Sequence, residues 1–493
     1  MSNIDQYEIV VGLEVHAQLQ TASKLFCGDS TAFGAEPNTH VSPITLGHPG
    51  TLPKMNSKAV SYAVKMGLAC HCEIERYNYF ARKNYFYPDL PKGYQVSQHT
   101  TPVCKGGYVK IKTTAGEKKV RLNRIHMEED AGKSIHDADE ANTCVDYNRA
   151  GTPLIEIVTE PDLRSGDEAL AYLSEVRKLV RYLGICDGNM EEGSLRCDAN
   201  ISVRKKGETT LGTKVEVKNL NSIRYVKKAV ETEARRLVEI LESGGTILQQ
   251  TRSYDAATGT TFAIRDKEDA DDYRYFPEPD LTPFQLQGDF IEEMRRSIPA
   301  LPEERISHYT TDLLLPEYDA AVLTEEIDTA AYFEELVKNL GCTLPLSPET
   351  KSRPKAAANW MLGPVKSWLN EQGRQMNEYP LQPAQLAPLI LLTESGKVSY
   401  TVAATRLLPM LLENPSLNPE QAAKEHNLLQ QSDASALEPL IDNVLAKFAD
   451  KVNEYKKGKK GLLALFVGEV MKQSKGKADP KLTNQLLLEK LKS

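Results

Sequence analysis

Apolar and polar residues alternate in residues 7–19, and this pattern predicts a β-strand. Glu14, His16 and Gln18 hold polar positions, so their side chains share one face of the predicted strand. Neighbours on that face lie about 7 Å apart, a spacing that lets them converge on one cation. The alternative is a surface strand whose polar face meets water.

The same alternation recurs further along the chain. In residues 197–203, Asp198 and Asn200 lie opposite apolar neighbours, and in residues 214–218 Glu216 lies between two lysines on one polar face. A sheet with such an ionic side is interpreted as the floor of a cleft; the alternative is an open antiparallel sheet wetted on one face. Further strands are predicted at residues 108–113, 119–122 and 153–158.

Helical spacing of apolar residues predicts helices at residues 57–66, 169–183 and 226–242. A helical region then begins at Pro302 and continues almost to the C-terminus, interrupted by a Pro/Ser-rich linker at residues 343–355 and a break at residues 414–419. Strands followed by helices predict an α+β protein. A chain of 493 residues is too long for one core, so several domains are expected.

Three consecutive acidic residues, Glu128, Glu129 and Asp130, come just before a Gly-Lys-Ser turn. Like charges this close repel, so a folded chain keeps them together only where water or a cation takes up the charge. Mg²⁺ binds carboxylate and phosphate oxygens, and Lys133 in the turn suits phosphate. A Walker A loop needs a glycine where this chain has Met127, so a P-loop NTPase is excluded.

Glu156 lies in the middle of the apolar strand predicted at residues 153–158. A lone carboxylate in that position costs several kcal/mol unless it is paired or binds a metal. Among single residues, Glu156 therefore argues most strongly for a functional site.

Residues 77–94 are dense in aromatic rings and cations, and their prolines predict an ordered loop rather than a helix. Such a mixture suits an adenine, a nucleotide or an RNA end; the alternative is a packed aromatic corner.

Cys70, His71 and Cys72 form one close group of possible zinc ligands. Structural zinc sites usually show two close pairs, so structural zinc is not expected.

Composition is that of a globular protein, with 41% apolar and 26% charged residues. No run approaches the length of a membrane span, the N-terminus lacks the features of a signal peptide, and the eight cysteines form no CxxC pair. A cytoplasmic protein is therefore expected.

The net charge of the chain is −8, yet residues 451–493 contain eleven lysines and four acidic residues, which leaves a net charge of −15 on the other residues. A basic tail suits nucleic acid; a solvated helical face is the alternative.

Several long motifs occur in the order typical of one family. They are Gly12–His16, Arg82–Asp89, His126–Ser134, Gly151–Ile157, Glu191–Asn200, Lys218–Ser222 and Asp271–Pro279. Together they resemble the B subunit of aspartyl/glutamyl-tRNA amidotransferases over nearly the whole chain. The resemblance implies an antiparallel-sheet cradle domain at residues 1–296, a helical domain at 297–413 and a YqeY-like helical tail at 414–493.

The resemblance also implies an activity. In this family the B subunit binds Glu-tRNA(Gln) or Asp-tRNA(Asn) and uses ATP to phosphorylate the side-chain carboxylate of the attached amino acid. Ammonia that a glutaminase subunit releases from glutamine displaces the phosphate, and a small third subunit holds the other two together. ATP and Mg²⁺ are the implied cofactors, and neither DNA nor a membrane is an expected partner.

The family's functional residues fall on definite positions of this chain. The resemblance implies Mg²⁺ ligands at Glu14, His16, Glu129 and Glu156, and a polar gate at Lys83 in the mouth of the ammonia passage. ATP is expected near Ser194, Arg196, Asp198 and Glu216, with Lys133 among the residues that balance charge on phosphate. Contacts to tRNA phosphates are expected from Lys456, Lys457, Lys459 and Lys460.

One departure from the family concerns zinc. Some members carry a zinc knuckle with paired cysteines in the loop after the first strand, whereas that loop has only Cys27 here. Two other functions stay open beside the amidotransferase. One is a non-catalytic tRNA-binding scaffold, in which the acidic residues form a solvated face. The other is an ATP-dependent ligase that acts on a small acid.

Overall fold

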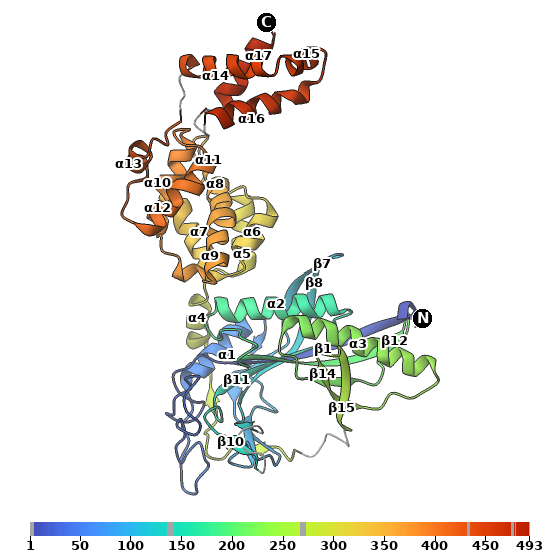
Figure 1. The fold of residues 1–493 in the computed structure, drawn as a ribbon. Coiled ribbons are helices and arrows are strands. Elements are labelled where there is room, and N and C mark those ends of the chain that lie inside the picture. The colour runs from blue at the N-terminus through green and yellow to red at the C-terminus, as the bar shows by residue number, and fades with distance from the viewer. Residues whose placement is uncertain are drawn as a thin grey trace. The chain divides into compact units, whose positions relative to one another are not determined.

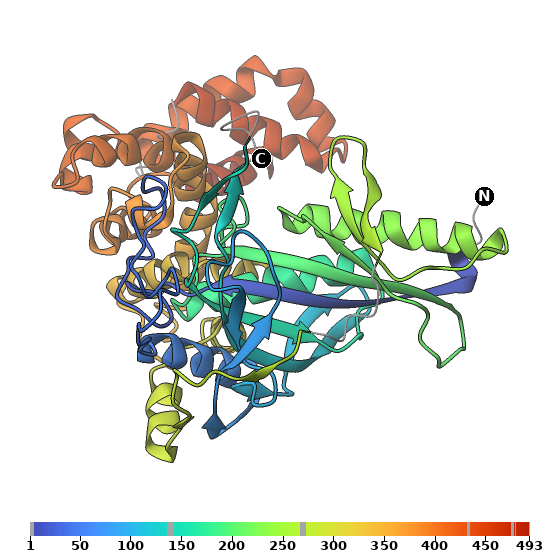
Figure 2. The ribbon, with the colours of Figure 1, turned by 90° about the horizontal axis from the view of Figure 1, so that it is seen from below.

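Strand β1 (Tyr7–Gln18) lies in the middle of a large sheet. It pairs in antiparallel orientation with β12 (Leu195–Lys205) on one side and with β11 (Pro153–Thr159) on the other. Figure 2 shows β1 running beside β12. The computed structural model describes residues 4–135, 142–266, 273–430, 434–474, 478 and 480–492.

Within the described residues, thirteen strands form this sheet, and the path through it runs β15-β14-β13-β12-β1-β11-β8-β5-β4-β16. All its pairs are antiparallel except β13 with β14. Besides β1, β11 and β12, its strands are β2 (Glu73–Ile74), β4 (Ala81–Asn84), β5 (Tyr94–Ser97), β6 (Cys104–Lys105), β7 (Tyr108–Thr113), β8 (Gly116–Glu129), β13 (Val215–Lys218), β14 (Gln250–Asp255), β15 (Thr260–Asp266) and β16 (Phe276–Pro277). Two further pairs join β9 (Lys133–Ile135) to β10 (Cys144–Asp146), and β3 (Tyr77–Asn78) to β17 (Phe284–Gln285).

Helices α2 (Gly166–Tyr182) and α3 (Ile223–Glu242) lie on one face of this sheet (Figure 1). Each follows a serine, Ser165 or Ser222, whose hydroxyl accepts a hydrogen bond from a backbone N–H of the first turn. Their apolar stripes share one core with the apolar residues of β1. The polar residues of β1 therefore face away from these helices. The first unit also contains α1 (Ser57–Ala69) and α4 (Gly288–Arg296).

The chain divides into two units, Met1–Leu301 and Pro302–Ser493. Buried apolar residues form one core in the first unit and two in the second. The predicted boundaries at 296 and 413 stay predictions. None of the described helices is long and apolar enough to cross a membrane.

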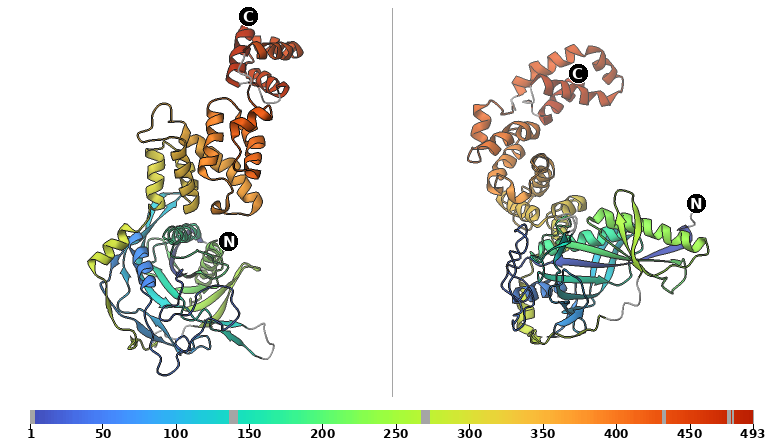
Figure 3. Two further views of the ribbon diagram at one scale, coloured as in Figure 1. Left: turned by 90° about the vertical axis from the view of Figure 1, so that its left-hand side faces the viewer. Right: turned by 60° about the horizontal axis from the view of Figure 1, so that its bottom comes forward.

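The second unit is built of helices, seen from two sides in Figure 3. They are α5 (Pro302–Thr311), α6 (Glu317–Leu323), α7 (Ile327–Asn339), α8 (Arg353–Trp360), α9 (Lys366–Gln372), α10 (Pro383–Glu394), α11 (Tyr400–Val402), α12 (Leu408–Glu413), α13 (Pro419–Glu425), α14 (Ala434–Lys447), α15 (Ala449–Lys456), α16 (Leu463–Gln473) and α17 (Pro480–Lys492). The predicted α+β class, with a sheet domain followed by helices, is confirmed.

Two local predictions differ from the structure. The strand expected at residues 119–122 belongs to the longer β8, which extends from Gly116 to Glu129. The ordered loop expected at residues 77–94 contains the strands β3 and β4. Its prolines all follow residue 87, so they leave β4 free to pair with β5.

Candidate functional site

A row of polar side chains crosses the sheet on the face opposite the helices. His16 of β1 lies opposite Glu156 of β11 and opposite Arg196 of β12, and Glu156 in turn lies opposite His126 of β8. Residues directly opposite each other in antiparallel strands point to the same face. The pairing register therefore brings together side chains that are far apart in the sequence.

Two histidines and two glutamates of this face form what we call the central cluster: His16, His126, Glu128 and Glu156. Nε2 of His16 lies 3.6 Å from Oε1 of Glu128 and 3.5 Å from Oε2 of Glu156. Nε2 of His126 lies 3.6 Å from Oε2 of Glu128 and 3.2 Å from Oε2 of Glu156. Among the residues that the structure describes, His16, Glu128 and Glu156 are the one trio whose possible metal ligands all lie within 4.8 Å of one another.

The central cluster fits a divalent cation. Ligands held about 2.1 Å from one Mg²⁺ in octahedral geometry lie about 3.0 Å apart when adjacent and about 4.2 Å apart when opposite. The distances of 3.5 and 3.6 Å from Nε2 of His16 to the two carboxylates are about half an ångström longer than those of adjacent ligands, a difference that small side-chain rotations would close. Carboxylate oxygens are the donors that Mg²⁺ and Mn²⁺ prefer.

Opposite charges compensate one another within the central cluster. Burial by itself lowers the pKa of His16 and of His126, but Glu156 and Glu128 outweigh it, so the pKa of His16 is raised and that of His126 rises to about 9. Burial raises the pKa of Glu156, yet the two histidines hold that pKa well below its usual value. Nε of Arg124 lies 3.3 Å from Nδ1 of His126; in the neutral ring Nδ1 accepts this hydrogen bond and the proton is on Nε2, toward the carboxylates.

Glu14 lies beside the central cluster, two residues before His16 on β1. Its Oε1 accepts a hydrogen bond from Nδ2 of Asn200 at 2.9 Å. Burial, followed by the charges of Glu156 and Glu216, raises the pKa of Glu14. A raised pKa at this position favours a proton or a cation near the carboxylate. Glu14 is thus a neighbour of the trio rather than one of its members.

Glu129 lies away from the central cluster, although it was expected among the ligands. Successive side chains of a strand point to opposite faces, so Glu128 and Glu129 of β8 lie on opposite faces of the sheet. Oε2 of Glu129 accepts a hydrogen bond from Nζ of Lys92 at 2.7 Å, and Oε1 accepts one from the backbone N–H of Val96 at 2.8 Å. The trio of possible ligands therefore contains Glu128 in place of the expected Glu129.

A cleft of about 1030 Å³ adjoins this face of the sheet. Four of the residues expected near ATP line it: Lys133, Ser194, Arg196 and Asp198. Glu216, the fifth, is buried and does not line it; its Oε2 accepts a hydrogen bond from Oγ1 of Thr251 at 2.8 Å. The cleft is formed from β9, from β12 with the loop before it, and from segments at residues 18–22, 31–35, 146–152 and 219–221.

Arg196 is held at the wall of this cleft by a buried carboxylate. Its two terminal nitrogens donate to the oxygens of Asp130 at 2.9 and 3.0 Å, and Nε2 of Gln18 donates to the same carboxylate at 2.6 Å. Burial raises the pKa of Asp130, but Arg196 and then Arg149 outweigh it and lower that pKa. A bidentate pair of this kind fixes the plane of the guanidinium.

Lys218 occupies the space between two of the acidic residues expected near ATP. Its Nζ lies 2.6 Å from Oδ2 of Asp198 and 3.3 Å from Oε1 of Glu216. The lysine therefore neutralises charge on these carboxylates in the absence of other cations.

Lys83 points to the same side of the sheet as the central cluster. Burial lowers its pKa, but Glu128, Tyr275 and Glu156 together outweigh burial and raise it. Its Nζ also lies 5.0 Å from the centre of the Tyr273 ring. The expected gate residue thus faces the same carboxylates as His16.

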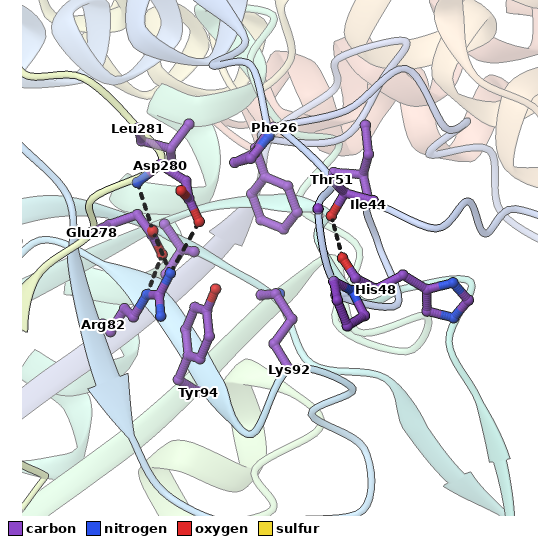
Figure 4. Close-up of a pocket in the computed structure, with 15 residues that line it drawn as sticks. Phe26, Ile44, His48, Thr51, Arg82, Lys92, Tyr94, Glu278, Asp280 and Leu281 are labelled. Carbon is purple, nitrogen blue, oxygen red and sulfur yellow. Dashed lines mark hydrogen bonds and ion pairs between the residues drawn. The ribbon is translucent and has the colours of Figure 1, made fainter.

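Figure 4 shows a second cavity, of about 250 Å³, whose lining includes Arg82, Lys92 and Tyr94. Nε and one terminal nitrogen of Arg82 each donate to Glu278 at 2.8 Å, and Asp280 accepts a further bond at 3.2 Å. The charges around this cavity are thus paired within the chain.

The four lysines expected to contact tRNA lie at the end of α15 and directly after it, and all are exposed. Nζ of Lys459 lies 3.0 Å from Oε2 of Glu454, and Nζ of Lys460 lies 4.3 Å from the centre of the Tyr455 ring. Asp271 and Asp272 of the last motif are outside the described residues.

The residues weighed as zinc ligands do not point toward one another. The ring of His71 stacks on Tyr108 with centroids 4.5 Å apart, and the thiol of Cys72 donates to the carbonyl oxygen of Gly106. Burial raises the pKa of Cys72 to about 12, which disfavours the thiolate that a metal binds.

Sequence reasoning missed His126 and the pair of Asp130 with Arg196, and from the acidic run it flagged for a cation it chose Glu129 rather than Glu128 as a ligand. A period of two along β8 places His126 and Glu128 on one face and Glu129 on the other. That period was the available signal for the carboxylate that faces the two histidines. The partner of Arg196 depends on the turn after β8, which carries no such period.

Two family models match the chain, one described as the GatB/GatE catalytic domain over residues 9–292 and one as the GatB domain over residues 346–491. The name of the second model joins GatB with YqeY, in agreement with the YqeY-like helical tail that was predicted. Curated proteins named as B subunits of aspartyl/glutamyl-tRNA(Asn/Gln) amidotransferase are similar over almost their whole length. Those of Geotalea uraniireducens and Geobacter sulfurreducens are 51% and 49% identical over 99% of both chains, and that of Thermodesulfovibrio yellowstonii is 49% identical over 99% of this chain and 100% of its own. The first match contains every residue of the central cluster.

Proposed function

Since this chain belongs to the family of the B subunits of aspartyl/glutamyl-tRNA(Asn/Gln) amidotransferases, we propose that it amidates the side-chain carboxylate of glutamate or aspartate carried on tRNA. In this proposal, ATP phosphorylates the carboxylate and ammonia then displaces the phosphate. A glutaminase subunit supplies the ammonia, and a small third subunit completes the complex. The observation that carries the proposal is the central cluster beside the large cleft.

The chemistry explains why a cation site is needed. A carboxylate reacts poorly with ammonia because its oxygen is a poor leaving group, and transfer of a phosphoryl group turns that oxygen into part of phosphate. When bound, Mg²⁺ would neutralise charge on the phosphate oxygens. His16, Glu128 and Glu156 would hold it, and Glu14 lies close enough to share their charge.

Residues of the cleft are suited to phosphate. Arg196 keeps a fixed orientation through Asp130, and Lys133 is exposed in the same cleft. A guanidinium and an ammonium on one wall bind phosphate oxygens through charge-assisted hydrogen bonds. Asp198 and Glu216 form ion pairs with Lys218 and thereby hold its ammonium near Glu14.

Exclusion of water is the second requirement, because an acyl phosphate hydrolyses readily. The side chains of Glu128 and Glu156 are 4% and 10% exposed. Ammonia is proposed to enter near Arg82–Asn84, where Lys83 faces these carboxylates. The low exposure keeps bulk water from the carboxylates that surround the reacting group.

The proposal is tested by Glu156→Gln in the reconstituted complex of the three subunits. With charged tRNA, ATP and no glutamine, we expect the rate of ADP formation to fall by about 100-fold or more, because the variant removes a charge that holds the cation. Binding of charged tRNA, measured by filter retention, should stay within about two-fold, since the phosphate contacts remain intact.

Glu160→Gln is the matched control. It makes the same chemical change just after β11, where Oε1 of Glu160 accepts a hydrogen bond from Nδ2 of Asn123 at 2.9 Å. The control should retain the wild-type rate. An unchanged rate of ADP formation in Glu156→Gln would favour the non-catalytic scaffold instead.

A further inference from the structure

Three tyrosines surround Lys83 on the side of the sheet that carries the central cluster. We call Tyr85, Tyr273 and Tyr275 the tyrosine wall. The ring centres of Tyr85 and Tyr273 are 5.9 Å apart, and those of Tyr273 and Tyr275 are 6.2 Å apart, both in edge-to-face contact. Nζ of Lys83 lies 5.7 Å from the centre of the Tyr85 ring and 5.0 Å from that of Tyr273. The wall is thus one aromatic group built around a cation.

The wall adjoins the central cluster. Ala81 of β4 pairs with Ser97 of β5, and Ser97 pairs with Glu128 of β8, so these residues share one face of the sheet. Lys83, two residues after Ala81, lies on the same face, and the rings of Tyr85 and Tyr273 lie around its Nζ. The wall therefore lies on the face of the sheet that carries the carboxylates proposed to hold the cation.

The backbone holds the wall in place at some cost. The N–H of Asn84 donates to the carbonyl oxygen of Tyr273 at 2.9 Å, and Nδ2 of Asn84 donates to that of Arg274 at 2.7 Å. Arg274, between two wall tyrosines, has a φ of 42°, in the left-handed region that a residue with a side chain rarely adopts. Such strain persists where the surrounding structure fixes it, and it is common at binding sites.

The rings of the wall remain able to take another planar group. Tyr85, Tyr273 and Tyr275 are each half-buried. The ring of His99 already stacks on Tyr275, with centroids 4.1 Å apart and an angle of 10° between the planes. This contact shows that at least one face of the wall accepts a flat ring in parallel.

We propose that the tyrosine wall stacks against the adenine of the 3′-terminal nucleoside of the charged tRNA. The inference rests on the proposed function, because the amino acid to be amidated is esterified to the ribose of that nucleoside. Only about 5 Å separate the ester carbon from the side-chain carboxyl carbon of glutamate, at ordinary bond lengths. A carboxylate that reacts at the central cluster therefore places the terminal base close to it, where the wall lies.

Charge and chemistry agree with an RNA end. Unpaired bases stack on aromatic side chains whatever their sequence, and a nearby cation attracts the backbone phosphate. Lys83 supplies that cation. The adenine of ATP is the other source of the same ring system. It is assigned elsewhere, because none of the three tyrosines lines the cleft that contains Lys133, Ser194 and Arg196.

The test uses the complex of three subunits and two uncharged tRNA competitors, one with a 3′-terminal adenosine and one with an abasic 3′-terminal nucleotide. Their inhibition constants against charged tRNA give a ratio that reports the terminal base alone. For the wild type we expect the abasic competitor to bind roughly 10-fold more weakly, the usual contribution of one stacked base. Tyr273→Ala should bring the ratio close to one, and Tyr273→Phe should keep it, because phenylalanine retains the ring.

The KM for ATP in Tyr273→Ala should match the wild type. A ratio near one in the wild type, or a ratio that survives in Tyr273→Ala, overturns the proposal. So does a loss in Tyr273→Phe, which would assign the effect to the hydroxyl, and so does a rise in the KM for ATP alone, which would assign the wall to the nucleotide. Because inhibition constants report binding, failure of the wall differs from failure of the amidation, in which the wild-type complex itself forms no amide.

Discussion

Two neighbouring glutamates on β8 have the same chemistry and different surroundings. Glu128 faces two histidines and a second carboxylate, whereas Glu129 faces Lys92 on the other side of the sheet. The side chains of Glu129 and Lys92 are 1% and 6% exposed, so each is the main compensation for the other's charge. The first carboxylate is the one proposed to share a divalent cation, and the second is neutralised by the ammonium of Lys92.

This difference predicts the effect of Glu129→Gln on stability. The variant leaves the buried ammonium of Lys92 without its counter-charge, so the free energy of unfolding should fall by about 3–5 kcal/mol. Adding Lys92→Met should restore most of that loss, because neither charge is then buried. Urea unfolding followed by circular dichroism measures both. A double variant no more stable than Glu129→Gln would contradict the assigned partnership.

A second residue-scale prediction concerns pH. Glu156 and Glu128 raise the pKa of His16, so its ring holds a proton to a higher pH than a free histidine, and a cation that binds this ring must displace the proton. Mg²⁺ affinity should therefore rise with pH, by up to about ten-fold per unit for one proton released, and level off above the pKa of His16. Isothermal titration calorimetry in buffers of different ionisation enthalpy reports the released proton, and binding without proton release would refute the linkage.

The raised pKa values of the two histidines also affect the stability of the cation-free protein, which should fall as the pH rises. A histidine whose pKa is raised on folding stabilises the folded state fully below its unfolded value of about 6.5. That stabilisation is lost as the pH rises through the folded value, which is about 9 for His126. Without Mg²⁺, the protein should therefore lose stability between pH 7 and 9, and added Mg²⁺ should reduce the loss.

At the residue scale, the sequence predicts only part of the site. The alternation in β1 places Glu14, His16 and Gln18 on one face, as the structure shows. The choice between Glu128 and Glu129 came from the resemblance to the family, and it disagrees with the strand period. Pairs such as Lys92 with Glu129 join residues far apart in the sequence, so no local pattern reveals them.

At the scale of elements, a buried ionic network joins α3 to the β14–β15 hairpin. Glu233 of α3 is 0% exposed and accepts hydrogen bonds from Nε of Arg236 at 3.0 Å and from Oγ1 of Thr261 at 2.7 Å. Nε of Arg252 lies 3.5 Å from the same carboxylate. The network therefore fixes the edge of the sheet onto the helix that covers it.

Glu233→Gln should loosen the hairpin. Loss of one buried charge from a network of two arginines costs about 3 kcal/mol, and the cost should appear where the network is anchored. Hydrogen exchange of backbone amides in β14 is expected to accelerate, whereas that in β1 should not change. Glu231→Gln, on the same helix but outside the network, is the control. Equal protection of β14 in both variants would show that the network does not hold the hairpin.

Elements were predicted best where one pattern dominates. The amphipathic helices at residues 169–183 and 226–242 correspond to α2 and α3, and the strand at residues 108–113 corresponds to β7. The short strands β3 and β4 fall within a predicted loop, because two to four residues are too few to show a period and pair only through tertiary context.

At the scale of the whole molecule, charge is distributed unevenly. The proposed chemistry lies in the first unit, and the lysine-rich segment lies near the end of the second. Excess charge of this sign near the C-terminus suits the phosphates of tRNA, as expected for the YqeY-like tail. We propose that the first unit carries out the reaction and that the second contributes affinity for tRNA.

Replacing Lys456, Lys457, Lys459 and Lys460 by glutamine should weaken tRNA binding and reduce its dependence on salt. Each phosphate contact contributes about 0.7–0.9 to the magnitude of the slope of log K against log salt. Loss of four contacts should therefore reduce the magnitude of that slope by up to about 3–4. Arginine at the same four positions keeps the charge and should keep the slope. Fluorescence anisotropy of labelled tRNA across a salt series measures it, and an unchanged slope in the glutamine variant would rule out these contacts.

The central claim is that His16, Glu128 and Glu156 hold one divalent cation. Electron paramagnetic resonance of Mn²⁺ titrated into the full chain tests it most directly. We expect one tightly bound Mn²⁺ in the wild type and in the Glu129→Gln/Lys92→Met double variant, and an affinity for Mn²⁺ lower by about ten-fold or more in Glu128→Gln and Glu156→Gln. Wild-type affinity in Glu128→Gln, with loss confined to the double variant, would contradict it.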